Sequence, residues 1–325
     1  MKKEEFDLAI IYEHPEWHQP LFEALDKAGV NYTTIDLKNG AMSFDTMPEA
    51  KLYYNMVSPS AYKRGNQHAI PYARALCKIL DNKHKRVLNG TKSNELEFSK
   101  TAQIAMLASI NANHPKTVVF NNLDALKKRT DLNFPMILKP EQGGSGARMY
   151  LINSMEELEN LLQMQPELWQ PDNLLLLQEK LENNPDFGIV RVEFVGKKFL
   201  YAMRVVTHGT FNLCPSVVCN PEDSTDGHCD VPLLSSSKPE FFSYHEIKPD
   251  EREEASRVFK ATGHDIGSVE YLITKVGKQV FYDINANSNL RPSIGQTWDI
   301  DPFEEVVKYL KDEIAKASQN LIASN

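Results

Sequence analysis

Short apolar runs alternate with helix-spaced apolar residues along the first part of the chain. Runs of this kind predict buried strands, and apolar residues three and four positions apart predict helices with one buried face. The expected strands are 6–12, 31–37, 51–57 and 86–89, and the expected helices are 14–28 and 69–80. Strands that alternate with helices indicate a small parallel α/β domain over residues 1–95.

The pattern changes after residue 95 to helices separated by single strands. An apolar stripe predicts one helix over 93–110, and Ser154 with Glu157 forms a capping-box pattern that predicts a helix start. The other elements expected are strands at 117–120 and 174–179 and helices at 123–129 and 154–164. Together they predict a second lobe over residues 96–178.

From Gly188 onward, apolar and polar residues alternate as in antiparallel strands. Gly196-Lys197 and Gly277-Lys278 are expected at the turns of two hairpins. The first hairpin joins strands 189–195 and 199–206, and the second joins the strands that contain Glu270 and Asp283. Helices are expected at 251–262 and 302–317, and a mobile polar loop is expected at 219–238. These elements predict a third, α+β lobe over residues 179–325.

The composition is that of a globular protein. The chain has 325 residues, 42% hydrophobic and 25% charged, and a net charge of −8, which argues against nucleic acid as the main partner. The start of the chain includes acidic residues and only a very short apolar run, unlike a signal peptide, and no apolar segment nears the roughly 18 residues that a spanning helix needs. We expect a cytoplasmic protein without a membrane partner, and homo-oligomerisation is left open.

The cysteines allow two interpretations. Cys77, Cys214, Cys219 and Cys229 contain no CxxC pair, but His228 beside Cys229 permits a zinc site. Isolated cysteines in a cytosolic chain are more often buried, reduced thiols. We favour reduced thiols.

The stretch 134–148 carries a clear chemical signal. A β-rich apolar run ends at Lys139, and a glycine-dense loop with Arg148 follows. The loop residues are Gly143, Gly144, Ser145 and Gly146. Lysine supplies a point charge for phosphate, and glycines let backbone N–H groups approach phosphate oxygens. Neither GxxxxGK[ST] nor GxGxxG is present, so we expect a phosphate site of another kind.

A second signal lies on the strands of the last predicted hairpin. Glu270, Asp283 and Asn285 carry oxygen side chains on facing strands, and Asp and Asn are disfavoured in a β-rich run without a reason. A solvent-facing acidic strand end is one explanation. Magnesium is the one we favour, with manganese as the alternative cation, because hard cations prefer oxygen ligands.

These motifs occur in a characteristic order along nearly the whole chain. In sequence they are Lys100, Lys139 with its glycine loop, Gln178-Glu179-Lys180, Arg204, Asn212, Glu270 and Asp283-x-Asn285. The order resembles the ATP-grasp superfamily, most closely the RimK-type and glutathione-synthetase-like carboxylate–amine ligases. The segment 54–64 followed by Asn89-Gly90 resembles the N-terminal domain of that group. The resemblance implies an N-terminal parallel α/β domain and two α+β lobes that clasp ATP.

The resemblance also implies a role for each matched position. Lys100 and Lys139 would contact ATP phosphates under the glycine loop, while Glu270, Asp283 and Asn285 would hold magnesium. The remaining matches are Gln178, Glu179, Lys180 and Leu181 at the adenine hinge, Asp186 at the ribose, and Arg204 and Asn212 near the γ-phosphate, metal and acyl intermediate.

The segment after Asn285 departs from the family, whose members often continue as Asn-x-x-Pro-Gly. Here 285–293 reads Asn-Ala-Asn-Ser-Asn-Leu-Arg-Pro-Ser. Arg291 is a candidate anchor for a substrate carboxylate, although a surface arginine is an equal alternative.

The resemblance implies ATP-dependent joining of a carboxylate to an amine. An acylphosphate would form with release of ADP, and an amine would then displace phosphate to give an amide or peptide bond. Amino acids or peptides are the expected substrates. The alternatives are an ATP-grasp kinase that forms no amide and an ATP-binding regulatory protein without turnover.

Overall fold

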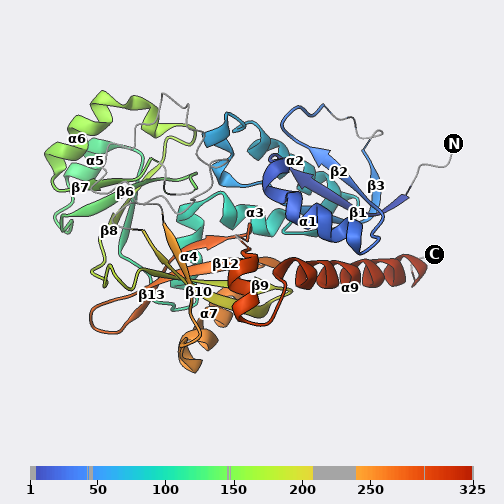
Figure 1. The fold of residues 1–325 in the computed structure, drawn as a ribbon. Helices are drawn as coiled ribbons and strands as arrows, with labels where there is room; N and C mark the ends of the chain where they lie inside the picture. The colour runs from blue at the N-terminus through green and yellow to red at the C-terminus, as the bar shows by residue number, and fades with distance from the viewer. Residues whose placement is uncertain are drawn as a thin grey trace.

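The structure is a computed structural model that describes residues 5–41, 43, 47–144, 146, 148–207, 239–288 and 290–323. These residues form three sheets, each built from one consecutive part of the chain (Figure 1). The N-terminal domain and the middle lobe lie side by side, and the C-terminal lobe lies below both in this view. Elements of all three parts therefore meet at one junction.

The N-terminal sheet is parallel. Its strands are β1 (Glu5–Tyr12), β2 (Tyr32–Asp36), β3 (Glu49–Asn55) and β4 (Arg86–Leu88), in the order β2-β1-β3-β4. One face packs Ala9 and Ile11 against Leu76 and Leu80 of α2 (Ala69–Asn82). β1 is buried without a break from Leu8 to Ile11, and since successive side chains point to opposite faces, both faces of the sheet must be covered.

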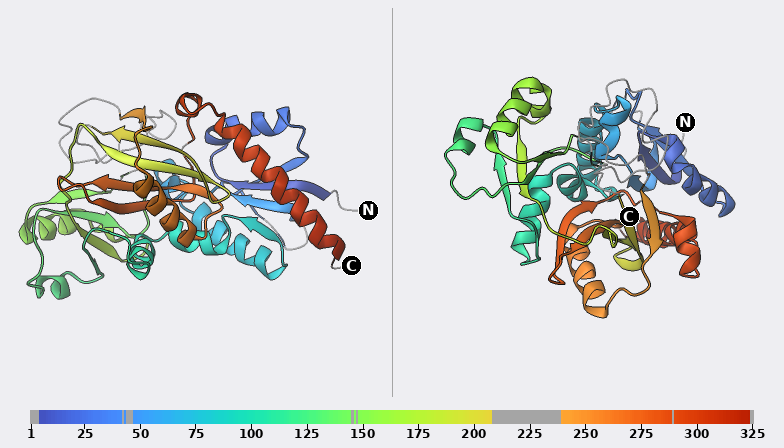
Figure 2. Two further views of the ribbon diagram at one scale, coloured as in Figure 1. Left: turned by 90° about the horizontal axis from the view of Figure 1, so that it is seen from below. Right: turned by 60° about the vertical axis from the view of Figure 1, so that its left-hand side comes forward.

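The other face of this sheet is covered by two helices from opposite ends of the sequence. Leu8 and Ile10 share a core with Leu25 of α1 (Pro15–Lys27) and Leu310 of α9 (Pro302–Ala323). Figure 2 shows α9 lying along the N-terminal domain. The C-terminal helix is thus a structural layer of the N-terminal domain.

The middle lobe is an antiparallel sheet covered by short helices. Its elements are β5 (Thr117–Phe120), β6 (Met136–Pro140), β7 (Tyr150–Ile152), β8 (Leu175–Glu179), α5 (Leu123–Lys127), α6 (Met155–Met164) and η2 (Pro166–Trp169), with strand order β5-β8-β6-β7. The predicted cap is present, since the Glu157 N–H donates to Ser154 Oγ at 3.1 Å. β6 ends just after Lys139, so the glycine loop leaves from the sheet's end.

The C-terminal sheet is also antiparallel. Its strands are β9 (Ile189–Val195), β10 (Lys198–Val206), β11 (Glu240–Ser243), β12 (Ile266–Ile273) and β13 (Gln279–Asn285), in the order β11-β10-β9-β12-β13. Helix α7 (Pro249–Thr262) covers one face, where Phe194 stacks on Phe259 at 4.4 Å between ring centroids. The opposite face is mixed: Arg191 and Glu193 lie there beside Tyr201 and Met203, which pack against Ile294.

The prediction of one helix over 93–110 was wrong, because two helices occupy it. These are α3 (Thr91–Glu97) and α4 (Lys100–Ser109). Ser99 interrupts the helix and caps the second one, accepting the Ala102 N–H at 2.9 Å. Four elements of the described residues were not predicted: η1 (Pro59–Arg64), η2, β11 and α8 (Pro292–Thr297).

Several other expectations fall outside the described residues. They are the loop 219–238 and the thiols of Cys214, Cys219 and Cys229 with His228. Cys77 is described, and it is a buried free thiol in the N-terminal core. Among the described helices, none has both the length and the apolar character needed to cross a membrane.

Candidate nucleotide and metal site

The predicted carboxylates meet on the face of the C-terminal sheet away from α7. Glu270 of β12 lies opposite Asp283 of β13, and Ser268 lies opposite Asn285. Arg191 of β9 lies opposite Glu270 on the other side. Directly opposite residues of an antiparallel pair point to the same face. Strand register alone therefore gathers two acids, an amide and an arginine.

Glu270 is held by hydrogen bonds to both carboxylate oxygens. Arg191 Nη1 donates at 2.7 Å, Asn285 Nδ2 at 3.3 Å and the Tyr282 hydroxyl at 2.9 Å. Tyr282 reaches this face because the register shifts between Glu270 and Tyr271, leaving Tyr282 as an extra residue in β13. Burial raises the pKa of Glu270, and the Arg191 charge opposes that shift.

Arg191 is a buried residue of the site that was not predicted. It also donates to Glu193 at 2.6 Å and to the backbone oxygen of Asn287 at 3.3 Å. Burial favours a lower pKa, but the Glu193 and Glu270 charges outweigh it and raise the pKa of Arg191 above its ordinary value. The signal was present, because an arginine and a glutamate alternate within the apolar strand 189–195.

Lys100 forms an ion pair with Asp283. Lys100 is the first residue of α4, and two hydrogen bonds connect the first turn of this helix to the end of β6. The Lys100 N–H donates to the Glu141 backbone oxygen at 3.1 Å, and the Thr101 N–H donates to the Glu141 carboxylate at 3.0 Å. Since Glu141 follows Lys139 by two residues, this contact brings both lysines to the acidic face. Burial favours a lower pKa for Lys100, but Asp283 outweighs it and raises the pKa.

Lys139 is buried with 6% of its surface exposed, and its Nζ lies 5.4 Å from the centre of the Tyr282 ring. Burial lowers the pKa of Lys139 to about 8; the Lys100 charge adds to the shift, while Asp283 opposes it. The ammonium is therefore only partly compensated by the protein. An anion such as a phosphate would complete its charge balance.

This lowered pKa predicts that nucleotide binding weakens as the pH rises. ATP favours the charged form of Lys139, so ATP binding is strongest below about pH 8, the pKa of Lys139 in the protein without nucleotide. Each pH unit above that pKa should weaken binding by up to about tenfold, until the pKa of the complex is reached. Calorimetric titration with Mg-ATP between pH 7 and pH 9 measures this. A Lys139→Met variant should lack the dependence, and an identical dependence in both proteins would contradict the assignment.

The glycine loop packs against η1 of the N-terminal domain. The Tyr62 hydroxyl donates to the Gly144 backbone oxygen at 3.3 Å, and the Arg148 guanidinium lies 4.7 Å over the Tyr62 ring. A Cβ on Gly144 would lie 2.9 Å from the Ser60 backbone nitrogen, so only glycine allows this approach. Gly143 and Gly146 flank the contact, and Ser145 is outside the described residues.

Replacing Gly144 with alanine should push the loop away from η1. The clash is with backbone at Ser60, which cannot rotate aside. We expect faster proteolysis between Gln142 and Arg148 and a lower ATP affinity, with little change in melting temperature. Tyr62→Phe removes only the hydroxyl contact and should have a smaller effect of the same sign. Equal proteolysis of the Gly144→Ala variant and wild type would refute the contact.

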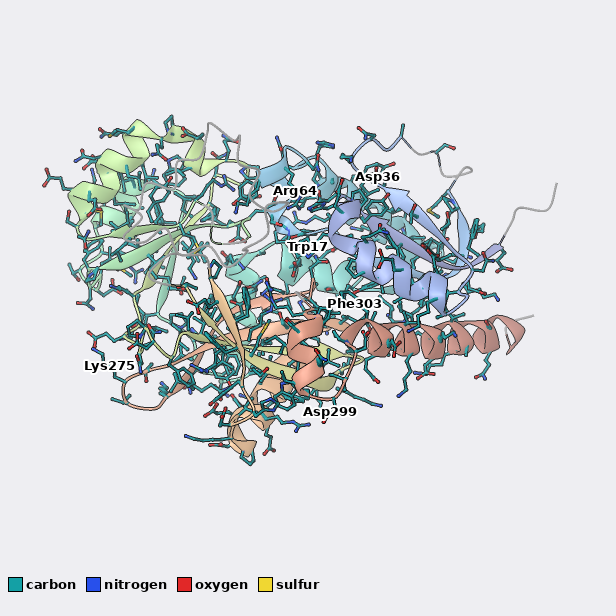
Figure 3. All side chains as sticks on the ribbon, viewed as in Figure 1. Trp17, Asp36, Arg64, Lys275, Asp299 and Phe303 are labelled. Atoms are coloured by element: carbon teal, nitrogen blue, oxygen red, sulfur yellow. The ribbon has the colours of Figure 1, made fainter. Side chains whose placement is uncertain are left out.

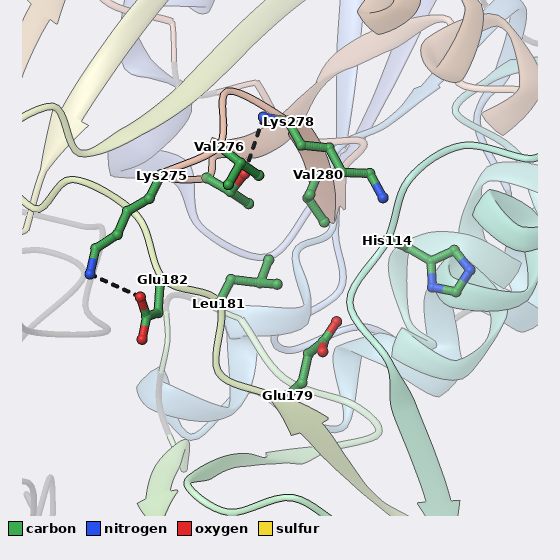
Figure 4. A pocket seen from close by; sticks show the side chains of 9 residues that line it. His114, Glu179, Leu181, Glu182, Lys275, Val276, Lys278 and Val280 are labelled. Atoms are coloured by element: carbon green, nitrogen blue, oxygen red, sulfur yellow. Dashed lines mark hydrogen bonds and ion pairs between the residues drawn. The ribbon is translucent and has the colours of Figure 1, made fainter.

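Two of the predicted hinge residues line a cavity of about 280 Å³ between the middle and C-terminal lobes. Figure 4 shows Glu179 and Leu181 on one side and Lys275 to Val280 of the β12–β13 turn on the other. Gln178 is buried beside it, donating to Thr117 Oγ1 at 3.0 Å. Lys180, which was predicted at the adenine hinge, and Asp186, which was predicted at the ribose, are both described by the structure but do not line this cavity.

Arg204 lies apart from the carboxylates. It pairs with Val190 of β9, so strand alternation places it on the opposite face from Arg191. There it donates to the Phe187 backbone oxygen at 3.2 Å and lies over the Phe187 and Phe242 rings. Asn212 is outside the described residues.

Arg291 follows β13 and is the N-cap residue of α8, where its side chain makes no capping hydrogen bond. Its backbone N–H donates to the Tyr201 hydroxyl at 2.9 Å, and its guanidinium lies 3.4 Å over the Phe241 ring. Its roles, like those of Arg204 and Asn212, stay predictions.

The trio Glu270, Asp283 and Asn285 fits magnesium by donor type. Across the part of the chain that the structure describes, no three His, Cys, Asp or Glu residues lie close enough together to hold a metal ion. This trio is of a different kind, because its third member is the amide Asn285. Carboxylate and amide oxygens are the ligands magnesium uses, usually with substrate phosphates. Asp283 is the more accessible acid, with 20% of its side chain exposed against 1% for Glu270.

The fold matches solved ATP-grasp ligases over nearly the whole chain. PsnB, complexed with a phosphomimetic variant of a minimal precursor, Mg and ADP, aligns with a TM-score of 0.65 and 14% identity, covering 95% of this chain and 99% of that chain. The RimK domain ATP-grasp protein from Sphaerobacter thermophilus gives 0.64 and 15% identity, covering 93% and 98%. VanG D-Ala:D-Ser ligase from Enterococcus faecalis gives 0.68 and 14% identity, covering 96% and 100%.

No family model and no curated protein matches the sequence. The structural matches nevertheless confirm the predicted fold: this chain has the ATP-grasp fold, with an N-terminal parallel α/β domain. At these identities the match concerns the fold, so function rests on the site.

Proposed function

We propose that this protein is an ATP-dependent carboxylate–amine ligase that releases ADP and phosphate. The observation that carries the proposal is the convergence of Lys100 and Lys139 with Glu270 and Asp283 where the middle and C-terminal lobes meet. The two lysines supply positive charge for the phosphates, and the acids supply oxygens for a cation. The ATP-grasp ligases PsnB and VanG share this fold.

The chemistry needs positioning and charge more than a protein nucleophile. A substrate carboxylate oxygen would attack the γ-phosphorus, the bond to the β-phosphate oxygen would break, and ADP would leave. An amine would then attack the acyl carbon, with loss of phosphate and a proton. Lys139 and Lys100 would hold the phosphates in line, which is how proteins accelerate phosphoryl transfer. Magnesium held by Glu270, Asp283 and Asn285 would neutralise phosphate charge.

The glycine loop would exclude water from the intermediate. Gly144 contacts η1 at Ser60 and Tyr62, so the loop bridges the middle lobe and the N-terminal domain. An acylphosphate hydrolyses readily, and a closed loop would protect it until the amine arrives.

The test is ADP release with Mg-ATP and a panel of amino acids and short peptides, singly and in pairs, followed by mass spectrometry. The proposal expects ADP release that needs both a carboxylate and an amine, and a product lighter than its components by one water. A phosphorylated product formed without an amine would identify a kinase instead. ATP binding without ADP release across the panel would identify a regulatory ATP-binding protein.

A further inference from the structure

A second cavity of about 380 Å³ lies between the N-terminal domain and the C-terminal lobe. Its walls come from α1, the end of β3, the segment after β13 and the start of α9. Figure 3 shows Trp17 and Phe303, which line it, on α1 and at the start of α9. Pockets for small molecules begin near 300 Å³, so this volume suits a ligand of amino-acid size.

The wall is mainly apolar. Trp17, Met56, Leu290 and Phe303 contribute apolar and aromatic surface. The described lining residues include no acid, and Arg291 is the one with a permanent charge. Apolar walls with one cationic side chain favour a ligand that joins a bulky apolar group to a carboxylate.

One lining side chain has an unused acceptor. Asn287 is 9% exposed, and its Nδ2 donates to the Val57 backbone oxygen at 2.9 Å. A carbonyl oxygen only accepts hydrogen bonds, so this contact fixes the amide orientation. Asn287 Oδ1 is then left buried without a hydrogen-bond partner, as is the neighbouring Ser288 Oγ. Buried acceptors of this kind are normally satisfied, and a ligand N–H would satisfy them.

The cavity adjoins the carboxylate face. The Asn287 backbone oxygen accepts from Arg191, and Arg191 also binds Glu270. Asn287 follows Asn285 by two residues. A ligand that touches Asn287 would therefore hold its polar end next to the candidate magnesium ligands.

We infer that this cavity binds an α-amino acid, free or at the end of a peptide, with a bulky apolar side chain. The inference rests on the proposed function and names the substrate class of the same site. The apolar side chain lies against Trp17 and Phe303, the N–H group donates to Asn287 Oδ1 and Ser288 Oγ, and the carboxylate lies on the Arg291 side.

The experiment measures both turnover and binding. ADP release is measured with glycine, alanine, leucine, phenylalanine and glutamate, and the same compounds are titrated calorimetrically in the presence of Mg-ADP. Leucine or phenylalanine should be favoured over glycine by about tenfold or more, because each methylene in an apolar pocket is worth about that much. Trp17→Leu should raise the KM for phenylalanine, and Ser288→Ala should raise the KM for every bound amino acid; neither should change the KM for ATP.

Leu25→Val is the matched control. Leu25 lies on the same helix as Trp17 and is buried in the core with Leu8 and Ile10, outside the cavity lining. It should leave both KM values unchanged, which separates loss of the pocket from loss of α1 packing.

The outcomes distinguish the two proposals. Turnover restricted to glycine, alanine or glutamate would overturn the inference and leave the ligase proposal standing. Calorimetric binding of phenylalanine that Trp17→Leu weakens, without ADP release from any compound of the panel alone or in pairs, would support the pocket and overturn the ligase proposal. Neither binding nor turnover with any apolar amino acid would overturn the inference.

Discussion

Replacing Lys139 with methionine should weaken ATP binding by about 1.5–3 kcal/mol, the range for a hydrogen bond to a charged group. Methionine keeps an unbranched stem in the buried position and removes the ammonium. Because burial already lowers the Lys139 pKa to about 8, the folded protein gains little from this charge before a nucleotide arrives. The free energy of unfolding at pH 7 should therefore hold or rise.

Isothermal titration calorimetry and thermal denaturation measure the two effects separately. Lys128→Met is the control, since Lys128 is exposed just beyond α5 in the same lobe. Unchanged ATP affinity in a folded Lys139→Met protein would remove Lys139 from the site.

Asp283→Asn should reduce ADP formation by on the order of 10²-fold, the scale for losing one preorganised electrostatic group. The amide keeps the shape but lacks the charge that attracts magnesium. Asparagine loses the ion pair with Lys100, although it still offers an oxygen acceptor. Its neutrality also removes the repulsion that, together with burial, raises the pKa of neighbouring Glu270. These effects oppose each other, so the melting temperature without ligand should stay near that of wild type.

The measurement is the rate of ADP release across a magnesium titration, with binding of magnesium-free ATP recorded beside it. Asp131→Asn, at an exposed ion pair with Arg129, controls for loss of a negative charge elsewhere. Wild-type turnover by the Asp283→Asn protein at low magnesium would refute the metal assignment.

Strand and helix periodicity predicted most of the elements, because buried strands read as short apolar runs and each helix buries only one face. The pairing of Glu270 with Asp283 was predictable for a local reason: a hairpin turn at Gly277 fixes which residues face each other. The break at Ser99 was missed because the apolar stripe continues across it. Serine is a preferred N-cap residue, so Ser99 itself could have indicated that a new helix begins after it.

The contacts between distant segments were beyond the sequence patterns. Glu141 joins the start of α4 to the end of β6, and Arg191 reaches both Glu270 and Asn287. Neither contact has a periodic signature, because each joins segments that are far apart in the sequence: α4 with β6 in the first case, and β9 with β12 and the segment after β13 in the second. The position of Arg204 is a further example, since alternation on β10 fixes its face only once the pairing with β9 is known.

The position of α9 has a consequence for the order in which the chain folds during synthesis. Leu8 and Ile10 of the first strand are covered partly by Leu310, which emerges from the ribosome about three hundred residues later. Until then, one face of the first sheet stays incompletely covered, while the middle sheet already has all its own helices. Domains generally complete in the order of synthesis. Here the N-terminal domain is synthesised first but should be among the last domains to complete its fold. A chain truncated before residue 302 should therefore expose apolar sheet surface and aggregate.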